Sequence, residues 1–183
     1  MSYHKILDFW FKENADKWFL KSTEFDSLIR KNFLTIYEDL KSEKEVGWED
    51  TPQSALAMII VLDQFPRNMF RGTEKAFETD VLARKLAKKS LLAGYDKKLS
   101  TPERAFLYLP LEHSEDLSDQ EDSVKFFTRL HEESSKDSMF LDYAIQHYKI
   151  IKRFGRFPHR NEVLNRKSTP EEIEFLKEKG SSF

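Results

Sequence analysis

Residues 22–40, STEFDSLIRKNFLTIYEDL, decide the fold. Their large apolar side chains recur at steps of three and four, the spacing that places them on one face of an α-helix. These are Phe25, Leu28, Ile29, Phe33, Ile36, Tyr37 and Leu40. Ser22 and Thr23 come directly before the pattern, where a hydroxyl can accept a hydrogen bond from a free backbone N–H of the first turn. The stretch therefore predicts an amphipathic helix that buries one side in a core.

Hydroxyl–proline pairs mark three further helix starts. A hydroxyl suits the N-cap and proline suits the first helical position, and this order occurs at Thr51-Pro52, Thr101-Pro102 and Thr169-Pro170. Glu172 lies three residues after Thr169, which indicates a capping box. Proline also interrupts helices, so we expect Pro66 to end the second helix and Pro110 to kink or end a later one.

Apolar spacing predicts the remaining elements. Helices are expected over 73–93, 118–133, 139–154 and 170–179, with Gly94 and Gly155 closing two of them in left-handed geometry. No segment shows sustained strand alternation bounded by turn signals. We therefore predict an all-α protein of seven or eight helices in antiparallel pairs, forming one domain over residues 1–183.

Composition excludes several classes of protein. The chain has no Cys, so it can form neither a disulfide nor a Cys-bound metal site. Its five Gly are isolated from one another, so no dinucleotide-binding or P-loop motif can be written. A formal net charge of −2 gives no bulk attraction to nucleic acid or anionic membrane. The longest apolar run, 55–62, is far shorter than the roughly 20 residues of a membrane span, and we expect a cytoplasmic protein without a signal peptide.

The first unusual stretch is residues 62–72, LDQFPRNMFRG, called here the first block. It is predicted to form a turn between two helices. Four of its polar side chains suit a carboxylate or phosphate, the arginines through forked donors and the amides through neutral hydrogen bonds. They are Gln64, Arg67, Asn68 and Arg71. The alternative is a structural turn in which Asp63 pairs with Arg67.

The second block is residues 109–115, LPLEHSE, at a proline-broken helix end. Glu112 or His113 there is a candidate general base. Metal binding has little support, because neither H-E-x-x-H nor E-x-x-H can be written around His113. The alternative is an acidic solvated loop in which His113 forms local hydrogen bonds.

The third block is residues 147–161, HYKIIKRFGRFPHRN, within a basic segment that runs to residue 167. Cationic and aromatic side chains alternate along this block. The cations could form a positively charged rim for an anion, and with RNA the aromatic rings could also stack on bases. The interleaved residues are Arg153, Phe154, Arg156, Phe157, His159 and Arg160. Structural explanations are the alternative. His147 lies on an apolar helix face, where a histidine is more often a hydrogen-bonded core residue than a ligand. The cations lie near a helix C-terminus, where positive charge is favourable.

Together these blocks resemble the bacterial domain-of-unknown-function family 924. The first block with Phe77 and Asp80 is similar to that family's hallmark, and Pro110–Glu115 and Arg153–Asn161 are similar to its other two blocks. Residues 168–176 and the opening aromatics Phe9, Trp10, Phe11, Trp18 and Phe19 fit as well, so the resemblance spans the chain. It implies an all-α fold similar to tetratricopeptide-like helix pairs in a right-handed superhelix, and no established activity.

Our leading hypothesis is a binding module without a cofactor. In an up-and-down helix array alternate connections fall on the same side, so the three blocks would line one cleft for a small anionic ligand or an acidic peptide. Its candidate residues are Asp63, Gln64, Arg67, Asn68, Arg71, Glu112, His113, His147, Arg153, Arg156, His159 and Arg160. At least one of the five arginines should then reach Glu112 or His113. The alternatives are an enzyme with Glu112 or His113 as base, and an RNA-binding protein using residues 147–167.

The first testable prediction is metal independence. Because Cys is absent and the His spacing is poor, protein purified without metal-affinity tags should contain no stoichiometric transition metal by elemental analysis. One equivalent of zinc, iron or manganese that disappears in His113→Ala would contradict it.

Overall fold

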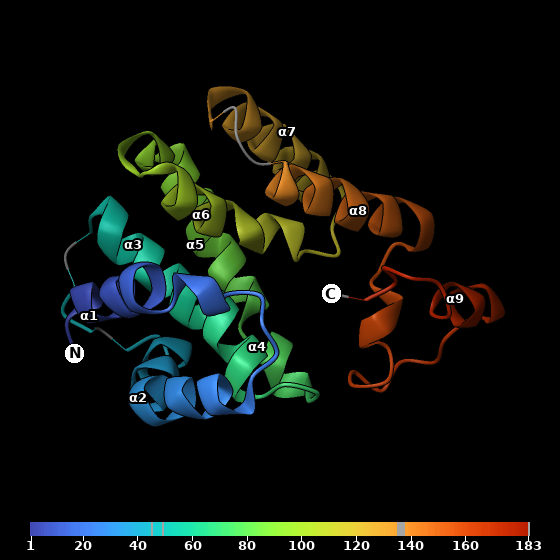
Figure 1. Cartoon of the computed structure of the whole chain (residues 1–183), viewed down its shortest axis with the longest axis horizontal. Coiled ribbons are helices and arrows are strands. Elements are labelled where there is room, and N and C mark those ends of the chain that lie inside the picture. The colour runs from blue at the N-terminus through green and yellow to red at the C-terminus, as the bar shows by residue number, and fades with distance from the viewer. Residues whose placement is uncertain (45, 49, 135–137, 183) are drawn as a thin grey trace. The chain divides into compact units, whose positions relative to one another are not determined.

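The computed structural model describes residues 1–44, 46–48, 50–134 and 138–182. Every regular element within these ranges is a helix and none is a strand, so the all-α prediction is confirmed (Figure 1). Residue contacts divide the chain into two compact units. Unit 1 holds residues 1–71 and 75–110, and unit 2 holds residues 72–74 and 111–183. The single domain and the tetratricopeptide-like superhelix stay predictions.

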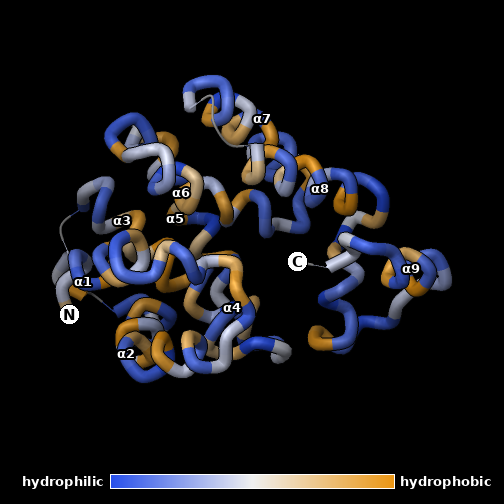
Figure 2. Tube along the Cα trace, in the orientation of Figure 1, coloured by the Kyte–Doolittle hydropathy of each residue, from blue (hydrophilic) through white to orange (hydrophobic). Residues whose placement is uncertain are grey.

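Unit 1 is built from pairs of helices. Its elements are α1 (Tyr3–Leu7), a π-helical segment (Asp8–Glu13), α2 (Thr23–Lys41), α3 (Pro52–Ile59), α4 (Phe65–Met69), α5 (Asp80–Leu92) and most of α6 (Thr101–Glu112). α1 packs against α3, α2 against α4, and α3 against α5. Hydrophobic and hydrophilic residues alternate around α2, as the quoted stretch predicts (Figure 2).

The opening aromatic residues form the core of unit 1. Phe9 meets the ring of Phe33 edge-on at 4.8 Å, and Phe33 stacks on Phe65 at 4.8 Å. Trp10 is fully buried and meets Phe65 at 5.6 Å and Phe106 at 5.5 Å. Large aromatic side chains bury the most apolar surface per residue, and these ring pairs join the π-helical segment Asp8–Glu13 to α2, α4 and α6 in one core.

The predicted helix starts are confirmed at three positions. Ser22 Oγ accepts from the N–H of Phe25, at 3.2 Å. Thr51 caps α3 reciprocally with Ser54. In unit 2, Thr169 and Glu172 form the predicted capping box. At α6 the cap lies one residue earlier, because Glu103 Oε2 accepts from both the N–H and the hydroxyl of Ser100, at 2.8 and 2.6 Å.

The predicted turn at residues 62–71 is wrong, because the helix continues through Pro66. α3 passes into a π-helical segment, Ile60–Gln64, and then into α4. In a regular helix Pro66 would clash with the carbonyl four residues before it, that of Leu62. The wider π turn alters this spacing, and the Leu62 carbonyl accepts instead from the Thr79 hydroxyl, at 2.6 Å. A side chain from farther along the chain therefore satisfies the group that proline releases.

Three other boundaries also differ from prediction. α5 begins at Asp80 rather than near residue 73, after a 3₁₀ turn at Glu74–Phe77. The Ala76 carbonyl, which a continuous helix would use, accepts from Arg67 Nη1 at 3.1 Å.

α6 runs through Pro110 to Glu112, where Gln120 Nε2 binds the terminal Glu112 carbonyl at 2.5 Å. Proline removes one N–H but does not stop this helix. The last helix, α9, ends at Phe175 rather than Lys179, because tighter bonds such as Glu178 N–H to the Phe175 carbonyl replace the α-helical ones.

Unit 2 contains α7 (Leu117–Ser134), α8 (Met139–Phe154) and α9 (Pro170–Phe175). α7 packs against α8, with Phe127 stacked on Phe140 at 5.8 Å. α8 ends at Gly155, whose φ of 69° is the left-handed value that glycine adopts at little cost. The chain then turns so that Phe157 and Phe175 bury against Ile150 and Ile151 of α8.

A second prediction concerns the hydroxyl that stabilises the π turn. Thr79→Val removes the donor to the buried Leu62 carbonyl while keeping the side chain's shape, so unfolding free energy should fall by about 1–3 kcal/mol. Chemical denaturation measures it. Thr35→Val, on the exposed side of α2, is the control, and an equal small effect in both variants would contradict the role of Thr79.

Candidate functional site

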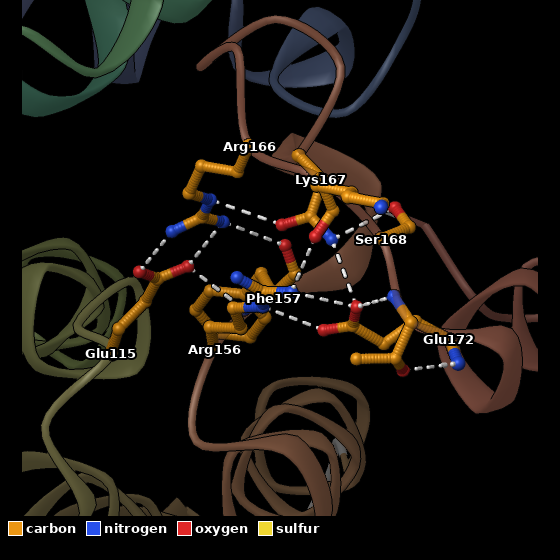
Figure 3. A network of polar contacts seen from close by, with 9 residues as sticks. Glu115, Arg156, Phe157, Arg166, Lys167, Ser168 and Glu172 are labelled. Atoms are coloured by element: carbon orange, nitrogen blue, oxygen red, sulfur yellow. Dashed lines mark hydrogen bonds and ion pairs between the residues drawn. The ribbon is translucent and has the colours of Figure 1, made fainter.

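An irregular segment after α8, residues 156–169, carries the end of the third block, residues 156–161. Its regular structure is one short 3₁₀ turn, Pro158–Arg160, and side-chain contacts hold the rest in place (Figure 3). Arg166 donates to both carboxylate oxygens of Glu115, at 2.7 and 2.9 Å, and to the Phe157 carbonyl, at 3.1 Å. The N–H of Phe157 donates to the same carboxylate, at 2.8 Å. Glu115 thus ties the segment to the residues that follow α6.

These contacts set the charge of Glu115. Burial opposes ionisation of its carboxyl group, but the hydrogen bonds from Arg166 and from the Phe157 N–H outweigh burial. The pKa of Glu115 is therefore lowered from its ordinary value. A bidentate guanidinium–carboxylate pair has one favoured geometry, so the carboxylate fixes the direction in which the segment leaves α8.

A second ion pair anchors the same segment to α9. Arg156 donates to the two carboxylate oxygens of Glu172, at 2.6 and 2.8 Å. Glu172 also accepts from the N–H of Thr169 at 2.7 Å and from Asn161 Nδ2 at 3.3 Å. The hydrogen bond from Arg156 is the main cause that lowers the pKa of Glu172 to about 2. The capping glutamate therefore holds the segment as well as starting the helix.

Glu112 and His147 meet beside this anchored segment. Nδ1 of His147 lies 2.8 Å from the Tyr143 carbonyl and 3.3 Å from Glu112 Oε1. A carbonyl can only accept, so Nδ1 carries the hydrogen and, in the neutral ring, Nε2 is the acceptor. Burial, followed by the nearby His113, lowers the pKa of His147 well below its ordinary value and outweighs the bond to Tyr143. His147 is therefore neutral near pH 7.

The ring of Phe157 is in contact with Arg160, His147 and His159. The guanidinium of Arg160 lies over the ring at 4.4 Å, and Arg160 Nη1 donates to the His113 carbonyl at 3.1 Å. His147 meets the ring edge-on at 5.4 Å, and His159 tilts against it at 5.6 Å. We call Glu112, His113, His147, His159 and Arg160 the histidine cluster.

The residues after α6 are fixed by α7. Gln120 Nε2 also donates to the Ser114 carbonyl at 2.7 Å, and Ser114 Oγ donates to Asp119 Oδ2 at 2.7 Å. Asp119 and Gln120 belong to the first turn of α7, so side chains of that turn hold the residues between α6 and α7 in place.

The first block forms its own network in unit 1. Arg67 donates to both carboxylate oxygens of Asp80, at 2.9 and 3.2 Å, and lies 3.5 Å from Asp63, so the pairing of Asp63 with Arg67 is present. Arg71 binds Asp26 through two hydrogen bonds, of 2.8 and 2.9 Å.

The amides of this block bind locally. Gln64 Nε2 donates to Asp63 Oδ2 at 2.7 Å, and Asn68 Nδ2 donates to the Gln64 carbonyl at 3.1 Å.

The second and third blocks meet within unit 2, and the expected contact of an arginine with His113 is made by Arg160. A common cleft that includes the first block stays a prediction. Arg153 and Arg156 bind the α9 glutamates Glu171 and Glu172. A role of either arginine in ligand binding also stays a prediction.

Sequence reasoning missed the partners that hold the cluster. These are Glu115, Gln120, Tyr143, Asn161, Arg166 and Glu172 in their observed roles. The capping-box pattern signalled a backbone role for Glu172, but nothing in the sequence pairs it with Arg156.

Comparison with known proteins gives the family. A family model described as "Bacterial protein of unknown function (DUF924)" matches residues 6–180. The chain belongs to this family. A solved structure of a protein of unknown function from Agrobacterium tumefaciens is 39% identical to this DUF924 protein, with 97% of each chain covered and a TM-score of 0.89. No curated protein matches the chain.

Two features of the described residues bear on function. None of the helices they form is both long and apolar enough to cross a bilayer. No group of three or more His, Asp or Glu side chains in the same ranges is placed to hold a metal ion. Metal independence of this DUF924 protein stays a prediction for elemental analysis.

The third prediction follows from the low pKa of Glu172. Its folded pKa of about 2 lies below the ordinary 4.5, so its stabilising effect is present above pH 4.5 and is lost as pH falls through about 2. Thermal melts between pH 7 and 2 should show the wild type losing Tm in this window more steeply than Glu172→Gln. Glu174→Gln, which alters an exposed pair with Lys177, is the control and should run parallel to the wild type. Parallel curves for all three proteins would contradict the prediction.

Proposed function

We propose that this protein is a binding protein whose histidine cluster holds a small anionic ligand, such as a molecule bearing phosphate or carboxylate. One observation carries the proposal. Side chains from α8 and from the segment after α8 surround the ring of Phe157. Arg160 binds the His113 carbonyl, Glu112 lies beside His147, and ion pairs outside the cluster fix the segment. Rigid support around a group of polar side chains is what a binding site requires.

The burial of the cluster favours a functional role over a purely structural one. Glu112, His147 and Arg160 are only 3%, 4% and 6% exposed. Taking ionisable groups out of water costs free energy, and strongly perturbed pKa values such as that of His147 concentrate at functional sites. The core of unit 2 already buries apolar residues of α8 and α9 nearby, so the cluster is not needed to fill space.

The donors of the cluster suit an anion. Arg160 is preorganised, because the His113 carbonyl and the Phe157 ring hold its guanidinium in one orientation. His113 and His159 are each partly exposed, so part of each residue is accessible from solvent. A phosphate or carboxylate would accept from these donors.

The RNA-binding alternative gains less support. Three arginines of the basic segment are engaged with carboxylates, Arg153 with Glu171, Arg156 with Glu172 and Arg166 with Glu115. Nucleic-acid affinity depends on cations that neutralise backbone phosphates. The engaged arginines would have to break these pairs before they could do so.

An enzyme is the second candidate function, and the Glu112–His147 contact favours it. A carboxylate beside Nδ1 and a neutral ring with Nε2 as acceptor is the arrangement of a general base. The base is then His147, oriented by Glu112, rather than Glu112 or His113. Turnover of a p-nitrophenyl ester or phosphate that His147→Gln abolishes would favour an enzyme over a binding protein.

The fourth prediction tests the anion site with inorganic phosphate. Calorimetric titration should show saturable binding that weakens about tenfold in the double variant His113→Ala, His159→Ala, because charge-assisted hydrogen bonds contribute about 1.5–3 kcal/mol. Both side chains are partly exposed, so the variant is expected to fold. Lys177→Ala is the control, because Lys177 lies exposed in its pair with Glu174. Equal affinity in all three proteins, or no saturable binding to the wild type, would overturn the proposal.

A further inference from the structure

A cavity of about 530 Å³ lies in unit 1. Its walls come from the end of α2, from residues 43, 44 and 46–48, from α3 with the π-helical segment, and from α5. Figure 1 labels α2, α3 and α5. The lining is mainly apolar and includes Leu40, Trp48, Met58, Leu62, Leu82 and Leu86. Its volume is that of a pocket for a small molecule, since such pockets run from about 300 to 1,000 Å³.

The wall of the cavity depends on the π-helical segment. Leu62 lies within that segment and lines the cavity, while its carbonyl accepts from the Thr79 hydroxyl. π-helical turns inside α-helices occur frequently at functional sites, where they redirect side chains. The irregular backbone of the first block thus contributes directly to the cavity.

Several lining side chains remain only half-buried. Met58, Leu82 and Leu86 each keep part of their apolar surface accessible, although neighbouring positions of the same helices are buried. Apolar surface removed from water contributes about 25 cal/mol per Å². An occupant that covers these three side chains would gain this free energy without disturbing the core.

Trp48 forms part of the lining. Its Nε1 donates to the Met1 carbonyl at 2.8 Å, and its ring meets Tyr3 edge-on at 6.0 Å. Gly47, with a φ of 67°, adopts the left-handed geometry that turns the chain directly before it. The indole and the flexible Met58 thioether together suit flat apolar ligands.

The charges of the cavity favour a neutral occupant. Among the lining residues that the structure describes, Glu43 and Lys44 are the charged ones, and their charges are opposite. Lys44 Nζ already lies 2.9 Å from Asp39 Oδ1. An anionic or cationic ligand would meet no surplus charge of opposite sign here.

We propose that this cavity binds a small, uncharged, mainly apolar molecule with a flat ring system. The site is independent of the histidine cluster, because every lining residue belongs to unit 1. The protein would therefore have two ligand sites of different chemistry, one in each unit.

The fifth prediction uses the neutral fluorescent probe N-phenyl-1-naphthylamine. Titration of the full chain should raise probe emission with one-to-one saturation and should quench Trp48, which lines the cavity. Leu86→Trp fills the cavity and should weaken probe binding at least about tenfold, as a loss of roughly 1.4 kcal/mol would produce. Val81→Trp is the matched control, because Val81 is an exposed residue of the same helix, 52% accessible.

Leu82→Gln provides a second variant of nearly constant volume at a half-buried position, and it should also weaken binding. Circular dichroism of each variant establishes that the helices are retained. Wild-type protein that does not bind the probe saturably would overturn the proposal. So would folded Leu86→Trp or Leu82→Gln proteins that bind it as the wild type does, or equal weakening in Val81→Trp.

Discussion

The arrangement of unit 2 depends on the hydrogen bonds that the Glu115 carboxylate accepts. Glu115 lies three residues after the end of α6 and accepts from Arg166 and from the backbone of Phe157, which come more than 40 residues later. The segment between α8 and α9 has little regular structure, so side-chain pairs must supply the contacts that a helix would form internally. Through Phe157, this one carboxylate also determines where Arg160 lies.

The ion pairs of unit 2 divide the basic residues into two groups. Arg156 and Arg166 bind glutamates and orient the backbone of the segment after α8. His147 and Arg160 are instead buried around the ring of Phe157, and Glu112 lies buried beside His147. The proposed function rests on this difference. Arg156 and Arg166 are already paired with glutamates that fix the fold, so the proposed ligand site uses the other group.

In unit 1 the main constraint is a proline inside a helix. Pro66 lies inside a helical run, and the π-helical segment before it removes the conflict with the Leu62 carbonyl, which Thr79 then binds. The same segment places Leu62 in the wall of the cavity. A local irregularity that allows proline within the helix is thus also what shapes the proposed apolar site.

The sequence by itself determined the all-α class, the caps at Ser22, Thr51 and Thr169, and the left-handed end of α8 at Gly155. These features rest on interactions between residues at most a few positions apart, and the order of residue types shows them directly. Only the tertiary structure decided that the helix passes through Pro66, because the partner of the Leu62 carbonyl lies 17 residues away. It alone paired Arg166 with Glu115, 51 residues apart, since a charge interacts with whichever opposite charge the fold brings near, and sequence order does not specify that distance.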